Sequence, residues 1–148
     1  MLQIKSVFIN FEDFPMGIDE DITLTWYAQS DKKNVILEKC RVVMYDEKRI
    51  YYDTGKVSHT DDIHISLEQA GCVSLHEYFI RVRIWDNSGG DSGWSEPAGF
   101  TTGILKEYEW KADMISAETV NDSGNSSSEY LYKEIDIKKN IKKAYACV

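Results

Sequence analysis

The run at residues 78–85, Tyr-Phe-Ile-Arg-Val-Arg-Ile-Trp, alternates between an apolar set of side chains and a set that carries two arginines. A period of two places alternate residues on opposite faces of a β-strand, so this run predicts a strand with one buried face. The segment 86–91 that follows is polar and contains two glycines, which accept the positive φ of a tight reversal. We therefore predict a hairpin whose returning strand opens at Trp94.

Similar short runs recur through the first hundred residues, with turn sequences between them. About seven short strands and no convincing helix indicate an all-β fold, an antiparallel two-sheet sandwich of the fibronectin type III or immunoglobulin kind. Such a domain takes about 100 residues, and we assign residues 1–103 to it. The other predicted strands lie at 2–9, 22–27, 40–45, 50–52 and 63–67, and the returning strand includes Ala98 and Phe100 and ends at residues 101–103.

The composition changes after residue 103. We interpret residues 104–128 as a connector, with the option of a short helix from Glu107 to Met114, that ends in a flexible loop rich in Ser, Gly and Asn. Residues 129–148 contain two more predicted strands around a Lys-Lys-Asn turn. Because a pair of strands is not stable alone, we predict that residues 129–148 are the truncated start of a second β-sandwich.

Charge and cysteine content exclude several classes of function. The chain has 17 Lys and Arg against 25 Asp and Glu, a net charge of −8, and no basic cluster that would neutralise phosphates, so we expect no nucleic-acid partner. Its three cysteines (40, 72 and 147) lack metal-ligand spacing. The N-terminus lacks the pattern of a signal peptide, and no apolar run is long enough to cross a bilayer. We expect no cofactor, no membrane partner and a cytoplasmic location.

No group of residues predicts catalysis or metal binding. The acidic clusters at 12–13, 19–21 and 61–62 lie in predicted turns without an apolar wall to raise a carboxyl pKa, so we interpret them as solvated loops. The acidic turn at 86–91 does not follow calcium-loop spacing, and we interpret it as a hairpin turn. The three histidines lack ligand spacing and are interpreted as isolated surface residues; they are His59, His64 and His76.

Aromatic residues divide into predicted core and predicted surface. Trp26, Tyr78 and Phe100 are expected in the core, and the Tyr78 hydroxyl is expected to bond to the backbone of the preceding loop, as in a tyrosine corner. We favour a structural cation–π ladder in which Trp94 stacks between the guanidinium groups of residues 81 and 83. The alternative is a sugar-stacking platform formed by Trp85 and Trp94, the two weak candidates for carbohydrate binding.

Several motifs occur in an order that resembles a known family. They are Pro-Met-Gly-Ile-Asp at 15–19 with Trp26 downstream, Asp-Thr-Gly-Lys-Val at 53–57, the strand at 78–86 with its Arg-Val-Arg, Ser92 to Pro97, Phe-Thr-Thr-Gly at 100–103 and Trp-Lys-Ala at 110–112. Together they resemble the N-terminal region of bacterial α-L-rhamnosidases, glycoside hydrolase family 78. Two positions, Met114 and Tyr132, depart from the family pattern.

The resemblance implies a fibronectin type III-like sandwich, then a jelly-roll domain of carbohydrate-binding character, then an (α/α)6 barrel with the catalytic carboxylates. In such a protein, residues 129–148 would be the first strands of the jelly roll. The parent enzyme would hydrolyse terminal α-L-rhamnosides with inversion, using an acid and a base separated by about 6.5–9.5 Å. Those residues would lie far downstream, so we expect this chain to carry no catalytic residue.

Two functions stay open at this point. The first is a structural unit that orients the downstream domains of the same polypeptide. The second is a stand-alone module that binds protein or carbohydrate through surface aromatics such as Tyr51, Tyr52, Trp85 and Trp94. A dimer formed by exchange of residues 129–148 between two copies is a further option.

Overall fold

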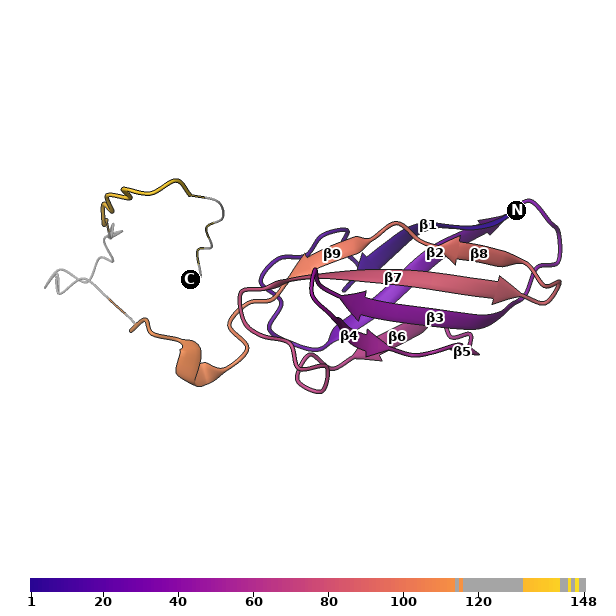
Figure 1. The fold of residues 1–148 in the computed structure, drawn as a ribbon, viewed down its shortest axis with the longest axis horizontal. Coiled ribbons are helices and arrows are strands. Elements are labelled where there is room, and N and C mark those ends of the chain that lie inside the picture. The colour runs from indigo at the N-terminus through magenta and orange to yellow at the C-terminus, as the bar shows by residue number, and fades with distance from the viewer. Residues whose placement is uncertain (114, 116–131, 142–143, 145, 147–148) are drawn as a thin grey trace, which may run out of the picture. The chain divides into compact units, whose positions relative to one another are not determined.

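The structure is a computed structural model that describes residues 1–113, 115, 132–141, 144 and 146. The chain divides into two units, Met1–Glu109 and Trp110–Val148. Among the described residues, all strands lie in the first unit (Figure 1). The jelly-roll strands predicted within 129–148 therefore stay a prediction, since the described residues 132–141 contain no strand and the rest of that region lies largely outside the described part.

The first unit is a two-sheet sandwich, which confirms the predicted all-β fold. Its smaller sheet has the order β1-β2-β6, and its larger sheet has the order β4-β3-β7-β8, with β5 also pairing with β3 and β9 with β7. These strand pairings are antiparallel. The elements are β1 (Leu2–Ile9), β2 (Ile22–Ser30), β3 (Leu37–Tyr45), β4 (Ile50–Asp53), β5 (Val57–Ser58), β6 (Asp62–Ile65), β7 (Glu77–Asp86), β8 (Asp91–Trp94), β9 (Ala98–Thr101) and the 3-10 helix η1 (Glu107–Glu109).

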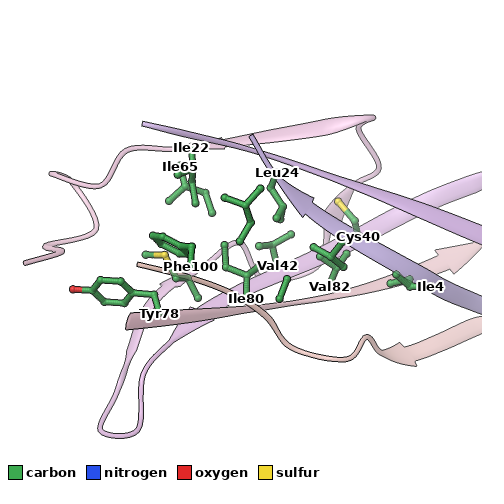
Figure 2. Close-up of a cluster of buried hydrophobic side chains, with 14 of the residues drawn as sticks. Ile4, Ile22, Leu24, Cys40, Val42, Ile65, Tyr78, Ile80, Val82 and Phe100 are labelled. Carbon is green, nitrogen blue, oxygen red and sulfur yellow. The ribbon is translucent and has the colours of Figure 1, made fainter. Parts of the chain in front are cut away.

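Strand β7 lies at the centre of the larger sheet and supplies one row of the core. Its inward side chains at 78, 80, 82 and 84 are fully buried, as the alternation in the sequence predicts. The inward residues of β3 at 40, 42 and 44 are buried beside them, and Ile22, Leu24 and Ile65 meet both rows from the smaller sheet (Figure 2). Each fully buried aliphatic side chain stabilises the fold by about 1.5–3 kcal/mol.

Tyr78 forms the predicted tyrosine corner. Its hydroxyl oxygen accepts a hydrogen bond of 2.8 Å from the backbone N–H of Val73, in the loop that precedes β7. The ring stacks on Phe100 with a centroid separation of 5.5 Å, and burial raises the pKa of the phenol above its ordinary value. Trp26 is only half-buried at the margin of the core, where its ring meets the edge of His59.

The returning strand is divided into β8 and β9, and the prediction that Trp94 opens it is wrong, because Asp91 does. Gly93 has a φ of 67°, and the pairing register shifts between Arg83 and Trp85, so the chain bulges before it resumes in β9. Ser95 bridges this interruption, since its N–H donates to the Val82 carbonyl at 2.8 Å and its hydroxyl oxygen accepts from the Val82 N–H at 3.0 Å.

The first unit continues six residues beyond the predicted boundary at 103. Leu105 packs against the core, and its N–H donates to the Ser74 hydroxyl at 2.8 Å. The same hydroxyl donates to the carboxylate of Glu109. The optional helix from residue 107 is shorter than expected, a single 3-10 turn over Glu107–Glu109. Residues 104–109 are thus fixed to the sandwich.

Candidate functional site

The outer face of the larger sheet carries an unusual concentration of arginine and aromatic side chains. We define this outer face as the outward residues of β3 and β7, namely Lys39, Arg41, Val43, Tyr45, Phe79, Arg81, Arg83 and Trp85, together with Trp94 of β8. The strand register places Arg41 opposite Arg83, Val43 opposite Arg81 and Lys39 opposite Trp85. Like charges directly opposite on neighbouring strands are destabilising unless other groups neutralise them.

Two of the three arginines are held by carboxylates from flanking strands. Arg41 donates to both carboxylate oxygens of Asp53 at 2.9 and 2.6 Å. Arg83 donates to both oxygens of Asp91 at 2.9 and 2.5 Å. Such two-point pairing is the strong form of an arginine–carboxylate contact. Each arginine accordingly lowers the pKa of its aspartate, and the pKa of Asp91 lies well below the usual range for a carboxyl group.

The two aspartates open the same short motif, Asp-Thr-Gly at 53–55 and Asp-Ser-Gly at 91–93. In the first copy the Thr54 hydroxyl oxygen accepts a hydrogen bond from the Val42 N–H of β3 at 2.9 Å. In the second copy the Ser92 hydroxyl oxygen accepts one from the Ile84 N–H of β7 at 3.0 Å. Each glycine has a positive φ, 63° and 67°, and its N–H donates to the aspartate at 2.8 and 2.9 Å. Our sequence reasoning missed this repeat, although the shared Asp-Ser/Thr-Gly spacing was visible.

The two candidate tryptophans lie on this face in different surroundings. The ring of Trp85 already contacts two cations, with Lys56 Nζ 4.1 Å and Arg83 Cζ 5.1 Å from its centroid. Trp94 is 39% exposed, and its cation–π contact is with Arg41 at 5.7 Å. The cation–π contacts therefore differ from the predicted stack of Trp94 between Arg81 and Arg83, because the indole contacts a cation of β3.

A groove of about 580 Å³ opens beside Trp94, towards the turn between β3 and β4. Tyr45 and Arg81 also line it, with Arg81 Cζ 6.0 Å from the tyrosine ring. Among the described residues, no carboxylate pairs with Arg81, and its buried Nε atom has no hydrogen-bond acceptor. Arg81 is thus the arginine of this face that lacks a counter-ion within the described structure.

His76 is not the isolated surface histidine that we expected. Its Nε2 lies 3.0 Å from Asp46 Oδ2, and its ring meets the edge of Tyr78 at 4.8 Å. Burial alone would raise the pKa of Asp46, because it disfavours the charged carboxylate. Hydrogen bonds from two backbone N–H groups of the turn, from His76 and from Tyr51 have the larger effect, and the pKa of Asp46 lies well below its usual range. The other two histidines have separate partners, Trp26 for His59 and Thr23 for His64.

The acidic turn after β7 is a hairpin turn, as predicted. Asp86 is almost fully buried and accepts hydrogen bonds from the N–H and hydroxyl of Ser88 and from the N–H of Gly90, at 2.9, 2.8 and 2.6 Å. Asn87 instead accepts from Ile36 of another loop, and Asp91 from Arg83. In the described part of the chain, no cluster of three or more His, Cys, Asp or Glu side chains suits a metal ion. No described helix is long and apolar enough to cross a membrane.

The chain is similar to α-L-rhamnosidases. One from Formosa agariphila is 27% identical over 142 residues, which cover 90% of this chain and 14% of that protein. A solved structure of the Streptomyces avermitilis enzyme, complexed with L-rhamnose, matches with a TM-score of 0.66 and 27% identity over 79% of this chain and 12% of that chain. The structure of the enzyme from Dictyoglumus thermophilum supports the fold, with a TM-score of 0.64, 24% identity and coverages of 74% and 13%. The chain therefore spans at most 14% of these relatives' lengths.

The family assignment rests on a match over most of the first unit. Residues 4–106 match the family described as "Rha78A-like, N-terminal immunoglobulin domain". The matched region coincides with the two-sheet sandwich and ends within the connector that is fixed to it. The resemblance read from the motifs is confirmed, and the chain belongs to the family of Rha78A-like N-terminal immunoglobulin domains.

Proposed function

We propose that this chain is the N-terminal, non-catalytic module of a larger α-L-rhamnosidase, and that it orients the domains that follow it. The observation that carries this proposal is the family match over residues 4–106, combined with the small share of each rhamnosidase that the chain spans. The parent would hydrolyse terminal α-L-rhamnosides with inversion, as the family resemblance implies. Its acid and base would belong to domains outside the matched region.

The way the chain leaves the sandwich supports an orienting role. Gly103 donates its N–H to the Ile18 carbonyl at 2.7 Å. Leu105 and Glu109 both form hydrogen bonds with the Ser74 hydroxyl. These contacts fix the path of the connector through residue 109 on the rigid sandwich. A fixed exit path restricts the directions in which a following domain can lie, whereas a free linker would leave domain motion as the default.

Exposed apolar side chains gather at the end of the sandwich from which the connector leaves. This end holds the loop between β1 and β2, the loop before β7 and the connector itself (Figure 1). Met16 is 74% exposed, Val73 54%, Leu75 42% and Tyr108 76%. Apolar surface of this kind is typical of a docking surface, and a following domain of the same polypeptide would cover it.

Three further assignments accompany this proposal. Residues 129–148 would be the first strands of a jelly-roll domain, in line with the order of domains in rhamnosidases. A cytoplasmic location and a dimer formed by exchange of residues 129–148 stay predictions.

Domain exchange in the Streptomyces avermitilis enzyme tests the orienting role. One variant lacks the matching domain, and a second carries residues 4–106 of this chain in its place. We expect the deletion to lower both kcat for an aryl α-L-rhamnoside and Tm, because the remaining domains lose a packing surface, and we expect the chimera to recover part of both losses. A deletion variant with the full activity and stability of the parent would disprove the orienting role. Turnover of the rhamnoside by residues 1–148 alone would disprove the non-catalytic assignment.

A further inference from the structure

We propose that the groove beside Trp94 binds a hexuronic acid residue of an acidic carbohydrate, with Arg81 pairing with its carboxylate and the indole packing against its ring. The groove is lined by side chains of β3, β7, β8 and the turn between β3 and β4. This inference goes beyond the proposed function, because a module that orients domains needs no ligand.

Arg81 is the first observation that points to an anionic ligand. Arg41 and Arg83 each bind both oxygens of an aspartate, and the described residues offer Arg81 no carboxylate. The Nε atom of Arg81 is closed to solvent and has no acceptor, so a ligand in the groove would pair with the terminal Nη groups. The guanidinium group presents parallel donors that match a carboxylate, so a sugar acid would complete on Arg81 the arrangement that the other two arginines already have.

The local charge supports the same conclusion. The whole chain carries a net charge of −8, yet the groove is lined by four cations and two carboxylates. Because Arg41 is already paired with Asp53, three cations remain against these two carboxylates, an excess of one positive charge. One carboxylate, Asp46, already accepts hydrogen bonds from Tyr51 and from two backbone N–H groups, and is close to His76. A local excess of positive charge in an acidic protein attracts an anion to this position. The four cations are Arg41, Lys48, Arg49 and Arg81.

The size and the aromatic lining of the groove favour a sugar. Its volume of about 580 Å³ lies within the range of about 300–1,000 Å³ that is usual for small-molecule sites. Trp94 is 39% exposed and offers an apolar ring beside the polar wall that Arg81 provides. One face of a pyranose ring carries C–H groups that pack on an indole, while its hydroxyl and carboxyl groups need polar partners. A neutral sugar such as L-rhamnose would leave Arg81 unpaired, and an isolated acidic peptide side chain would leave the indole uncovered.

The test is an NMR titration of the 15N-labelled chain of residues 1–148 with trigalacturonate. The expected result is saturable binding, with shifts at the Trp94 indole N–H and at the backbone N–H groups of Val43 and Arg81. The fully methyl-esterified trimer has the same shape without charge, and we expect it to bind at least about tenfold more weakly, because it cannot form the charge-assisted pair. L-rhamnose is expected to cause no saturable shift at these positions.

A pair of variants distinguishes specific binding in the groove from a nonspecific effect of positive charge on this face. Arg81→Gln should weaken trigalacturonate binding by about tenfold or more. Lys39→Gln removes one positive charge from the same outer face outside the groove and should change affinity by less than about twofold. If Arg81→Gln does not fold, the acid and ester titrations of the unmodified chain decide the question.

Several results would overturn the proposal. One is the absence of saturable binding by trigalacturonate, and another is equal binding of the acid and its ester. Equal losses in the two variants would reduce the effect to net charge. A glutamate-rich peptide that binds at the same residues more tightly than the sugar would make the groove a docking site for protein. None of these results depends on whether the module orients rhamnosidase domains, which the domain exchange measures separately.

Discussion

Arg41 and Arg83 lie directly opposite each other on β3 and β7, and each is held by its own aspartate from the strand beyond. Asp53 and Asp91 approach from the two sides of this strand pair, through two copies of one Asp-Ser/Thr-Gly motif. Across the sheet, the four side chains therefore place two adjacent positive charges between two negative ones. This arrangement turns a repulsive pair at the centre of the outer face into two neutral pairs.

Removing either carboxylate should expose the repulsion between the two arginines. We expect Asp53→Asn and Asp91→Asn each to lower Tm by about 2–5 °C, and the double variant to lose more than the sum, because only then are both cations unpaired. Thermal unfolding at low salt measures this, with Glu20→Gln as a control on an exposed carboxylate. Salt at about 1 M should recover part of the loss by screening. If the decreases in Tm of the two single variants add up to that of the double variant and do not change with salt concentration, the two ion pairs act independently.

The indole of Trp94 should stabilise the outer face whether or not a sugar binds there. Trp94→Ala removes the cation–π contact with Arg41 and part of the apolar cover of β7, and we expect Tm to fall by a few degrees. Trp110→Ala is the matched control, since Trp110 is 43% exposed and lies in the second unit. An unchanged melting curve for Trp94→Ala would show that the contact with Arg41 contributes nothing to stability.

The hydrogen bond of the Tyr78 hydroxyl should stabilise the fold in addition to the packing of the Tyr78 ring. Tyr78→Phe keeps the ring and its stacking on Phe100, but it leaves the Val73 N–H without its acceptor. Val73 is 54% exposed, so water can partly replace the lost acceptor, and we expect the loss of a typical hydrogen bond, about 0.5–1.5 kcal/mol of unfolding free energy. Urea unfolding measures the change, and Tyr27→Phe at an exposed position of β2 should change the free energy by less than about 0.5 kcal/mol. Equal effects of the two variants would speak against the hydrogen bond.

Stability should fall on acidification through the hairpin turn after β7. Hydrogen bonds from Gly90 and Ser88 hold the pKa of Asp86 below its ordinary value. The unfolded chain therefore binds a proton at higher pH than the folded chain, so the contribution of Asp86 is complete above about pH 5 and is lost as pH falls below about 4. Thermal unfolding from pH 7 to pH 3 should show Asp86→Asn less stable at neutral pH, with the difference from the unmodified chain shrinking in acid. A constant difference across this range would rule out the ionised Asp86 as its source.

Local patterns predicted the parts of this fold that depend on near neighbours in the chain. The alternation at residues 78–85 identified β7 and its buried face, and the position of Tyr78 at the start of that strand identified the tyrosine corner. Both follow from periodicity within one strand and from the loop directly before it. The order of the motifs was enough to indicate the family.

Features set by contacts between distant segments could not be predicted in the same way. The pairing of Arg41 with Asp53 depends on how β3 and β4 are placed side by side, and the boundary at residue 109 depends on Ser74, which lies 31 residues before Leu105. The unpaired state of Arg81 appears only once the partners of Arg41 and Arg83 are known. Alternation shows that Arg81 faces outward, but it does not show which arginines share that face with a carboxylate.

A self-contained immunoglobulin-like module should fold from residues 1–109 alone. We expect this segment to keep the dispersed NMR spectrum of β1–β9 and to unfold in urea at the same midpoint as residues 1–148, because the hydrophobic core closes within the first unit. The amide protons of β3 and β7 should be the slowest to exchange in both forms. A truncated segment that loses its dispersed spectrum, or that unfolds at a clearly lower urea concentration, would contradict a self-contained immunoglobulin-like module.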